Sequence, residues 1–199
     1  MALLGALAVL SLLPLLEAHN LTLTNLTAIP LTNATLEWLS GRWFFLGSAF
    51  RNPAYKQAAE EIQAAFFDFV PNLAEDTILV RDYQTMEDKC IHNSTNLRVQ
   101  RENGTLSKFE GGVEHLAVLL LPKNSRSFML GFSLEDAQNL GLSFYGDKPH
   151  ITPGQLEEFQ DAATVLGLLK TEMTYVDWKK DQCGPLQQQQ GQDKEEVEP

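Results

Sequence analysis

Short runs of apolar and β-branched residues, separated by turn-forming residues, fill the chain from Gly41 to about Asp147. Asn103-Gly104 is the strongest hairpin signal among the breaks. Many short strands at even spacing are typical of an antiparallel sandwich or barrel in one domain. The pattern predicts strands at residues 41–50, 64–70, 76–85, 90–101, 104–110, 114–121, 127–133 and 141–147.

Alternation along two of these strands predicts which side chains point inward. In the second strand Asp68 is expected to face water, which places Ala65, Phe67 and Phe69 inside. In the seventh strand Phe128, Leu130 and Phe132 share one face. Strands three, six and eight are apolar on both faces, so periodicity alone does not orient them.

The last third of the chain has helical character. Thr152-Pro153 supplies an N-cap and a first-turn proline. An apolar stripe follows and predicts an amphipathic helix packed on the outside of the sheet. Residues 36–40 are expected to form a short turn, and residues 175–178 a final strand. The predicted fold class is therefore all-β with one C-terminal α-helix, whose stripe comprises Leu156, Phe159, Ala163, Leu166 and Leu169.

Both ends of the chain differ from this domain in composition. Residues 1–18 are apolar, too short to span a bilayer, and end in a small residue, as in a signal peptide. A buried N-terminal helix is the alternative interpretation. Residues 186–199 are rich in Gln and acidic residues, which predicts a disordered tail. The single folded domain is expected at 19–185, without stable membrane insertion.

Five N-x-S/T triplets follow the predicted signal peptide and indicate a secreted, extracellular glycoprotein. An occupied asparagine must lie on the surface, so the neighbouring backbone is expected to be exposed. The acceptors are Asn20, Asn25, Asn33, Asn93 and Asn103.

Charge and cysteine content further narrow the class of protein to which the chain can belong. Acidic residues outnumber Lys and Arg by 26 to 15, which argues against nucleic acid and anionic membranes as partners. Cys90 and Cys183 are the two cysteines, and in an oxidising compartment they are expected to form one disulfide. Two free thiols, one of them a nucleophile, are the alternative.

Motifs that would carry catalysis are missing from the sequence. There is no G-x-S-x-G elbow, no phosphate-cradling glycine loop, and no H-E-x-x-H or C-x-x-C spacing. The histidines are scattered singly at His19, His92, His115 and His150. No enzymatic activity, cofactor or metal is expected.

Gly41-Arg42-Trp43 resembles the G-x-W signature that opens the barrel of lipocalins. The signal peptide, the predicted strands, the later helix and a late cysteine follow in the order found in that family. The resemblance implies an eight-stranded antiparallel up-and-down β-barrel with a ligand cavity. One departure is that the arginine of the family's third motif is replaced near Gly146.

Several segments resemble the alpha-1-acid glycoprotein family of lipocalins more narrowly, namely residues 29–35, 48–52, 99–105 and 176–181. This resemblance implies a monomeric carrier secreted into blood plasma. Its expected ligands are small lipophilic molecules, namely basic drugs such as amphiphilic amines, neutral drugs and steroids. The resemblance also implies an acute-phase role that modulates inflammation.

The expected site combines an apolar wall with a few polar groups. Asp82 matters most, because a carboxylate near apolar walls is poorly solvated and favours a ligand ammonium group. Lys108 would weaken that attraction if it paired with Asp82, and both residues are alternatively ordinary rim charges. The wall is expected from Phe45, Phe67, Phe69, Val80, Leu97, Ala117, Phe128, Leu130, Phe132 and Tyr145, and the polar groups from Asp82, Gln84, Lys108, His115, Ser143 and the Tyr145 hydroxyl.

Two other functions are compatible with the sequence. The sequons would suit a regulator of inflammation that acts through its surface glycans, with the barrel as a scaffold. One lipocalin branch uses a barrel cysteine as a nucleophile, and this chain would need a free Cys90 or Cys183 to do so.

Overall fold

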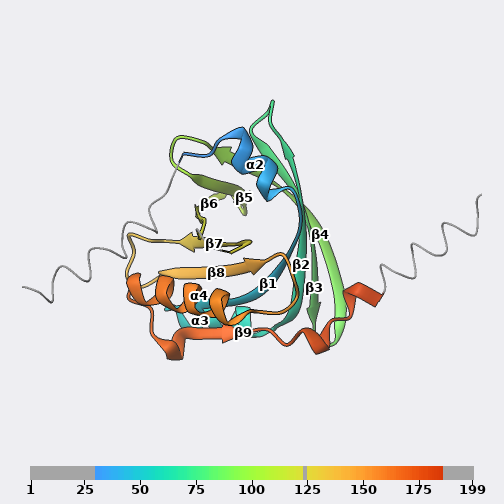
Figure 1. The fold of residues 1–199 in the computed structure, drawn as a ribbon, viewed down its shortest axis with the longest axis vertical. Coiled ribbons are helices and arrows are strands. Elements are labelled where there is room, and N and C mark those ends of the chain that lie inside the picture. The colour runs from blue at the N-terminus through green and yellow to red at the C-terminus, as the bar shows by residue number, and fades with distance from the viewer. Residues whose placement is uncertain (1–29, 123–124, 186–199) are drawn as a thin grey trace, which may run out of the picture.

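A closed antiparallel barrel forms the body of the molecule in the computed structural model, which describes residues 30–122 and 125–185 (Figure 1). Each strand pairs with the next, and the first strand pairs with both the second and the eighth. The predicted eight-stranded up-and-down barrel is confirmed, with strand ends within about two residues of expectation. The strands are β1 Gly41–Phe50, β2 Ile62–Asn72, β3 Thr77–Met86, β4 Lys89–Gln100, β5 Thr105–Glu110, β6 Val113–Leu120, β7 Ser127–Phe132 and β8 Gly141–Gly146.

β1 changes partner along its length. Its first residues pair with β2, while the stretch after Phe45 pairs with a short ninth strand, β9 Met173–Tyr175. Gly47 permits this close approach, since a Cβ there would lie 2.5 Å from the Thr174 carbonyl oxygen. The final strand therefore lies earlier than the predicted 175–178. Trp178 instead donates its indole N–H to the Phe45 carbonyl at 3.2 Å.

Within residues 30–122 and 125–185, three α-helices accompany the barrel: the predicted C-terminal helix and two short helices that the sequence did not predict. Thr32 and Thr35 form a capping box that starts α2 Asn33–Leu39, which replaces the turn predicted at 36–40. Asn52 caps α3 Pro53–Glu60, with proline in its first turn. Both helices are about two turns long, too short for helical periodicity to separate them from loops.

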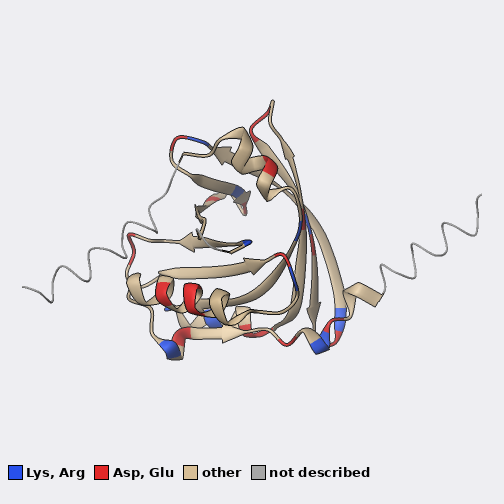
Figure 2. Cartoon of the chain, viewed as in Figure 1, with Lys and Arg blue, Asp and Glu red and all other residues tan. Residues whose placement is uncertain are grey.

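The C-terminal helix is α4 Pro153–Val165, and it packs on the outside of the barrel as predicted. Phe159 is fully buried and stacks on Phe144 of β8, with ring centroids 5.1 Å apart. Acidic positions mark the ribbon of this helix in Figure 2, and Glu157 and Asp161 are exposed. The predicted stripe is wrong at Leu169, which is 62% exposed, because the helix ends before the left-handed Gly167.

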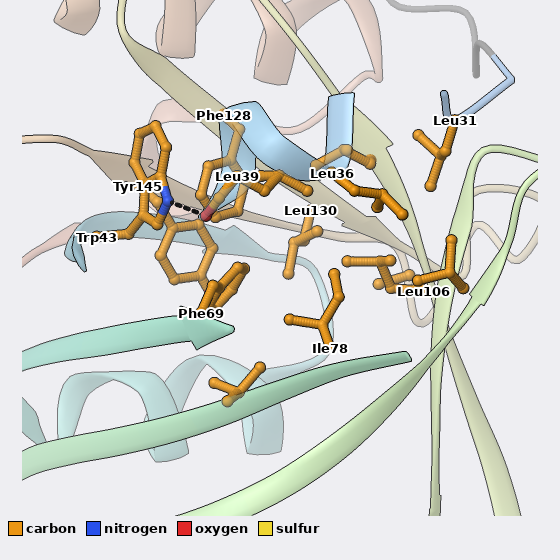
Figure 3. Close-up of a cluster of buried hydrophobic side chains, with 14 of the residues drawn as sticks. Leu31, Leu36, Leu39, Trp43, Phe69, Ile78, Leu106, Phe128, Leu130 and Tyr145 are labelled. Carbon is orange, nitrogen blue, oxygen red and sulfur yellow. Dashed lines mark hydrogen bonds between the residues drawn. The ribbon is translucent and has the colours of Figure 1, made fainter. Parts of the chain in front are cut away.

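Trp43 closes one end of the barrel beneath α2. Its side chain is 1% exposed and donates its indole N–H to the Leu39 carbonyl at 2.7 Å (Figure 3). Leu36 and Leu39 are fully buried beside it. The Arg126 guanidinium lies 5.4 Å from the Trp43 ring, so a cation covers this ring although no arginine follows β8 near Gly146.

Cys90 and Cys183 form a disulfide, as predicted. The bond ties the beginning of β4 to the segment after β9, across a sequence separation of 93 residues. Cys183 is buried, and its backbone N–H donates to Asp181 at 2.9 Å. Neither thiol is available as a nucleophile.

Some predictions fall beyond the described part of the chain. The signal peptide at 1–18, the acceptors Asn20 and Asn25, and the tail at 186–199 lie outside it. Within residues 30–122 and 125–185, no helix combines the length and apolar character that crossing a membrane requires.

Replacing Cys90 and Cys183 together by alanine is expected to lower the free energy of unfolding by about 2–5 kcal/mol, because the bond constrains the unfolded chain. Urea unfolding followed by tryptophan fluorescence measures the loss. A reductant should destabilise the wild-type protein to the same extent and leave the double variant unaffected. A double variant as stable as the oxidised wild type would contradict the proposed role.

Candidate ligand-binding site

Two cavities of about 650 and 630 Å³ occupy the half of the barrel remote from α2. Both are lined by residues near the strand ends opposite Trp43, and the second also by α3. They share a wall formed by Phe67, His115, Leu116, Phe132 and Tyr145. These volumes are in the range of small-molecule sites, and aromatic walls of this kind suit lipophilic ligands.

The first cavity contains most of the predicted site residues. Inward-facing positions of β2 and β3 place the Asp82 carboxylate and the Gln84 amide beside aromatic rings. Asp82 and Lys108 therefore both line the cavity. The predicted residues found here are Phe67, Phe69, Val80, Asp82, Gln84, Leu97, Lys108, His115, Ala117, Leu130, Phe132 and Tyr145.

The second cavity lies between α3 and the β1–β8 side of the barrel. It contains the predicted residues Phe45 and Ser143 together with the shared wall. Further residues line it from β1, from the unpredicted α3 and from the beginning of β2, and the sequence did not predict their role. These residues are Phe50, Tyr55, Ala58, Ala59 and Ile62.

Phe128 is the predicted wall residue that lines neither cavity. It is fully buried in the closed-end core, where its ring packs edge-on against Trp43 at 4.9 Å and stacks on Tyr145 at 4.7 Å. Strand alternation correctly placed its side chain inside, but alternation does not distinguish the filled end of a barrel from the open end. Phe128 thus forms part of the core behind the cavities.

Tyr145 separates the two cavities and is surrounded by aromatic rings. Phe45, Phe67 and Phe128 lie within 5.7 Å of it, centroid to centroid. Burial raises the pKa of the Tyr145 phenol to about 12, although a hydrogen bond with Ser143 acts in the opposite direction. Tyr145 is therefore a neutral hydroxyl at physiological pH, able to donate or accept a hydrogen bond inside an apolar wall.

The first cavity contains two carboxylates, from Asp82 and Glu110, and one lysine, Lys108. Lys108 Nζ lies 2.5 Å from Glu110 Oε2, so Lys108 pairs with Glu110 and not with Asp82. This hydrogen bond lowers the pKa of Glu110. Asp82 accepts a hydrogen bond from the Gln84 amide at 3.0 Å and has no ion pair within the described residues. Its charge remains available to a cation in the cavity.

Further residues of β4 and β5 complete the first cavity, and the sequence did not predict that they line it. Asn93, Ser94 and Thr95 line it from β4, while Leu106, Ser107 and Glu110 line it from β5. The Ser107 hydroxyl is buried without a hydrogen-bond partner. Asn93-Ser94-Thr95 is also a sequon, so the glycan acceptor Asn93 lines the cavity.

The described part of the chain contains no cluster of three His, Cys, Asp or Glu side chains arranged to hold a metal ion. His92 stacks on Tyr83 outside the cavities, while His115 lies in their shared wall. The three sequons at Asn33, Asn93 and Asn103 all have exposed asparagines.

Comparisons with known proteins agree with this architecture. The Lipocalin / cytosolic fatty-acid binding protein family matches residues 40–180. A solved siderocalin structure, Ex-FABP, shares the fold with a TM-score of 0.56 and 11% identity over 70% of this chain and 93% of that one. The chain therefore belongs to the lipocalin family.

Curated relatives narrow the assignment. Alpha-1-acid glycoprotein of Bos taurus is 53% identical over 95% of this chain and 94% of its own length. The protein of the same name from Oryctolagus cuniculus is 54% identical, also over 95% of this chain and 94% of its own length. Within the lipocalins, the chain groups with the alpha-1-acid glycoproteins. It is a secreted, acute-phase plasma glycoprotein that binds small molecules and is not an enzyme.

Tyr145→Phe is expected to make the protein more resistant to alkaline pH. The ordinary pKa of 10.0 applies to the unfolded chain and a pKa of about 12 to the folded one, so stability falls as pH rises between them. Between about pH 9 and about pH 11.5 the wild type should lose about 2 kcal/mol more stability than the variant. Urea unfolding at about pH 9 and about pH 11.5 measures it.

Tyr55→Phe is the matched control, because Tyr55 is 51% exposed. This variant should retain the alkaline loss of the wild type. If Tyr145→Phe lost as much stability at alkaline pH as the wild type does, the pKa of Tyr145 would not be raised in the folded protein.

Proposed function

We propose that the protein carries lipophilic amines and neutral lipophilic compounds, steroids among them, in the two cavities of its barrel. The single observation that supports this proposal most directly is the Asp82 carboxylate, which lies without an ion pair beside aromatic rings in the first cavity. An immunomodulatory role is a further part of the proposal and rests on family membership.

A ligand ammonium group fits the charge distribution of the first cavity. Asp82 and Glu110 contribute carboxylates, and Lys108 is engaged by Glu110. A cation near Asp82 replaces part of the solvation that the carboxylate lacks near apolar walls. The apolar body of the same ligand would lie against Phe67, Phe69 and Val80. Each large ring contributes up to about 1–3 kcal/mol by removing apolar area from water.

Neutral ligands suit the second cavity better. Its wall is mainly aromatic and aliphatic, with Phe45, Phe50 and Ile62 among its residues, and Glu114 is the one carboxylate among the residues that line it. Ser143 and the neutral Tyr145 hydroxyl offer hydrogen bonds to a ligand hydroxyl or carbonyl without a formal charge. This combination supports steroid-like compounds as ligands.

Asp82→Asn is expected to weaken binding of a lipophilic amine about tenfold, equivalent to about 1.4 kcal/mol, because the amide removes the charge and keeps the shape. Binding of progesterone, which is neutral, should be unchanged. Titration followed by tryptophan fluorescence measures both dissociation constants. Asp161→Asn is the matched control, since it makes the same charge change on the exposed side of α4.

Three outcomes separate the possibilities. An equal loss in Asp82→Asn and Asp161→Asn would mean that only the net charge of the protein matters. Unchanged amine binding in Asp82→Asn would keep the carrier and remove Asp82 from its mechanism. If neither amine nor steroid bound the wild type, the function would lie with the surface glycans instead.

A further inference from the structure

The β4 sequon lies on the inner face of the barrel wall. Along β4 the inward positions are Val99, Leu97, Thr95 and Asn93, of which Val99 and Leu97 belong to the core and the other two line the first cavity. Strand alternation therefore directs both the glycan acceptor and its partner Thr95 toward the cavity. Asn93 is nevertheless exposed, because it lies at the open end.

The barrel wall is incomplete next to this sequon. The ladder between β4 and β5 covers only Arg98–Gln100 of β4 and Thr105–Ser107 of β5. Before Arg98, β4 pairs with β3 alone among the described strands, while the rest of β5 pairs with β6. The two strands thus separate where Asn93 and Lys108 line the cavity, and this gap forms part of its mouth.

Asn93 is also next to the carboxylate that the proposed function assigns to amines. It is the direct cross-strand partner of Asp82, and Asp82 is in turn the partner of Phe67. Directly opposed side chains on one face of a sheet lie about 5 Å apart at Cβ. A glycan attached to Asn93 would therefore begin beside Asp82, among the polar groups of Gln84 and Thr95.

We propose that the N-glycan on Asn93 acts as a gate at the mouth of the first cavity. Its first sugars would cover the gap between β4 and β5, so that ligands reaching Asp82 enter and leave slowly. The second cavity has its own lining from α3 and β1 and does not include Asn93. Ligands of the second cavity would bypass the gate. This inference rests on the proposed carrier function.

The other described sequons provide controls within the same chain. Asn33 begins α2, and Asn103 lies in the turn between β4 and β5, both at the closed end. Neither residue lines either cavity. A glycan at these positions adds mass and hydration to the protein without covering the mouth.

The test measures binding kinetics of protein secreted from glycosylating cells, with occupancy of Asn93 established by peptide mass spectrometry. Stopped-flow tryptophan fluorescence follows N,N-dimethyldodecylamine and, separately, progesterone. Asn93→Gln and Thr95→Ala both remove the glycan. Thr95→Ser preserves the sequon, and Asn103→Gln removes a glycan from the closed end.

Asn93→Gln and Thr95→Ala are expected to raise both the association and the dissociation rate constants of the amine about tenfold. The dissociation constant should change less than about threefold, because a gate alters entry and exit alike. Asn103→Gln should behave as the wild type does, and Thr95→Ser, which keeps the glycan, should keep the slow association and dissociation that Thr95→Ala loses. Progesterone kinetics should be the same in all of these proteins.

Any one of three results would overturn the gate and leave the carrier function intact. Asn93 carries no glycan, the amine kinetics are equal in the wild type and Asn93→Gln, or Asn103→Gln accelerates them as much as Asn93→Gln does. Absence of saturable binding in the wild type and in every variant would instead overturn the carrier function, and the gate with it.

Discussion

The whole structure depends on the position of β1, because this strand closes the sheet into a barrel. Its first residues pair with β2, the stretch from Phe44 to Phe50 pairs with β8, and its second half also pairs with β9. Trp43 lies near the beginning of this strand, where its indole N–H fixes α2 over the end of the barrel. With one end filled by aromatic packing, the cavities are confined to the other end. The beginning of β1 thus lies at the closed end of the barrel, and its last residues lie at the end where ligands enter.

The aromatic side chains that fill the closed end of the barrel also determine where the ligand cavities end. Trp43, Phe69 and Phe128 pack against one another, and the Phe128 ring stacks on Tyr145. Tyr145 belongs both to this stack and to the shared wall of the cavities. A ligand in either cavity would therefore contact a side chain that the core holds in place, which favours a preformed site.

Much of the fold could be predicted from the sequence, because strand length and turn chemistry are local properties. The alternation around Asp68 and along β7 was sufficient to place Phe67 and Leu130 in the cavity wall. The orientation of β3, and with it the position of Asp82, came from family resemblance, since that strand is apolar on both faces. Local pattern did not predict α3, whose two turns owe their stability to the Asn52 cap and to packing on the barrel.

The rest of the site could not be predicted from the sequence, for reasons that differ from residue to residue. Phe128 could not be excluded from the cavity, because its burial depends on how α2 and Trp43 close the barrel. The sequence does not decide whether Lys108 pairs with Asp82 across the cavity or with Glu110, which lies two residues further along the same face of β5. The sequon correctly predicts an exposed Asn93, but it does not show that the same side chain also lines the mouth of the first cavity.

The early part of β4 has a consequence for solubility. Because, among the described strands, it pairs with β3 alone before Arg98, its other side presents backbone N–H and C=O groups that a foreign strand could join. Polar side chains dominate this stretch, with Lys89, Asn93 and Asn96 all exposed. A bulky sugar on Asn93 would add steric protection there. Such features protect an open sheet edge from edge-to-edge association in a concentrated fluid such as plasma.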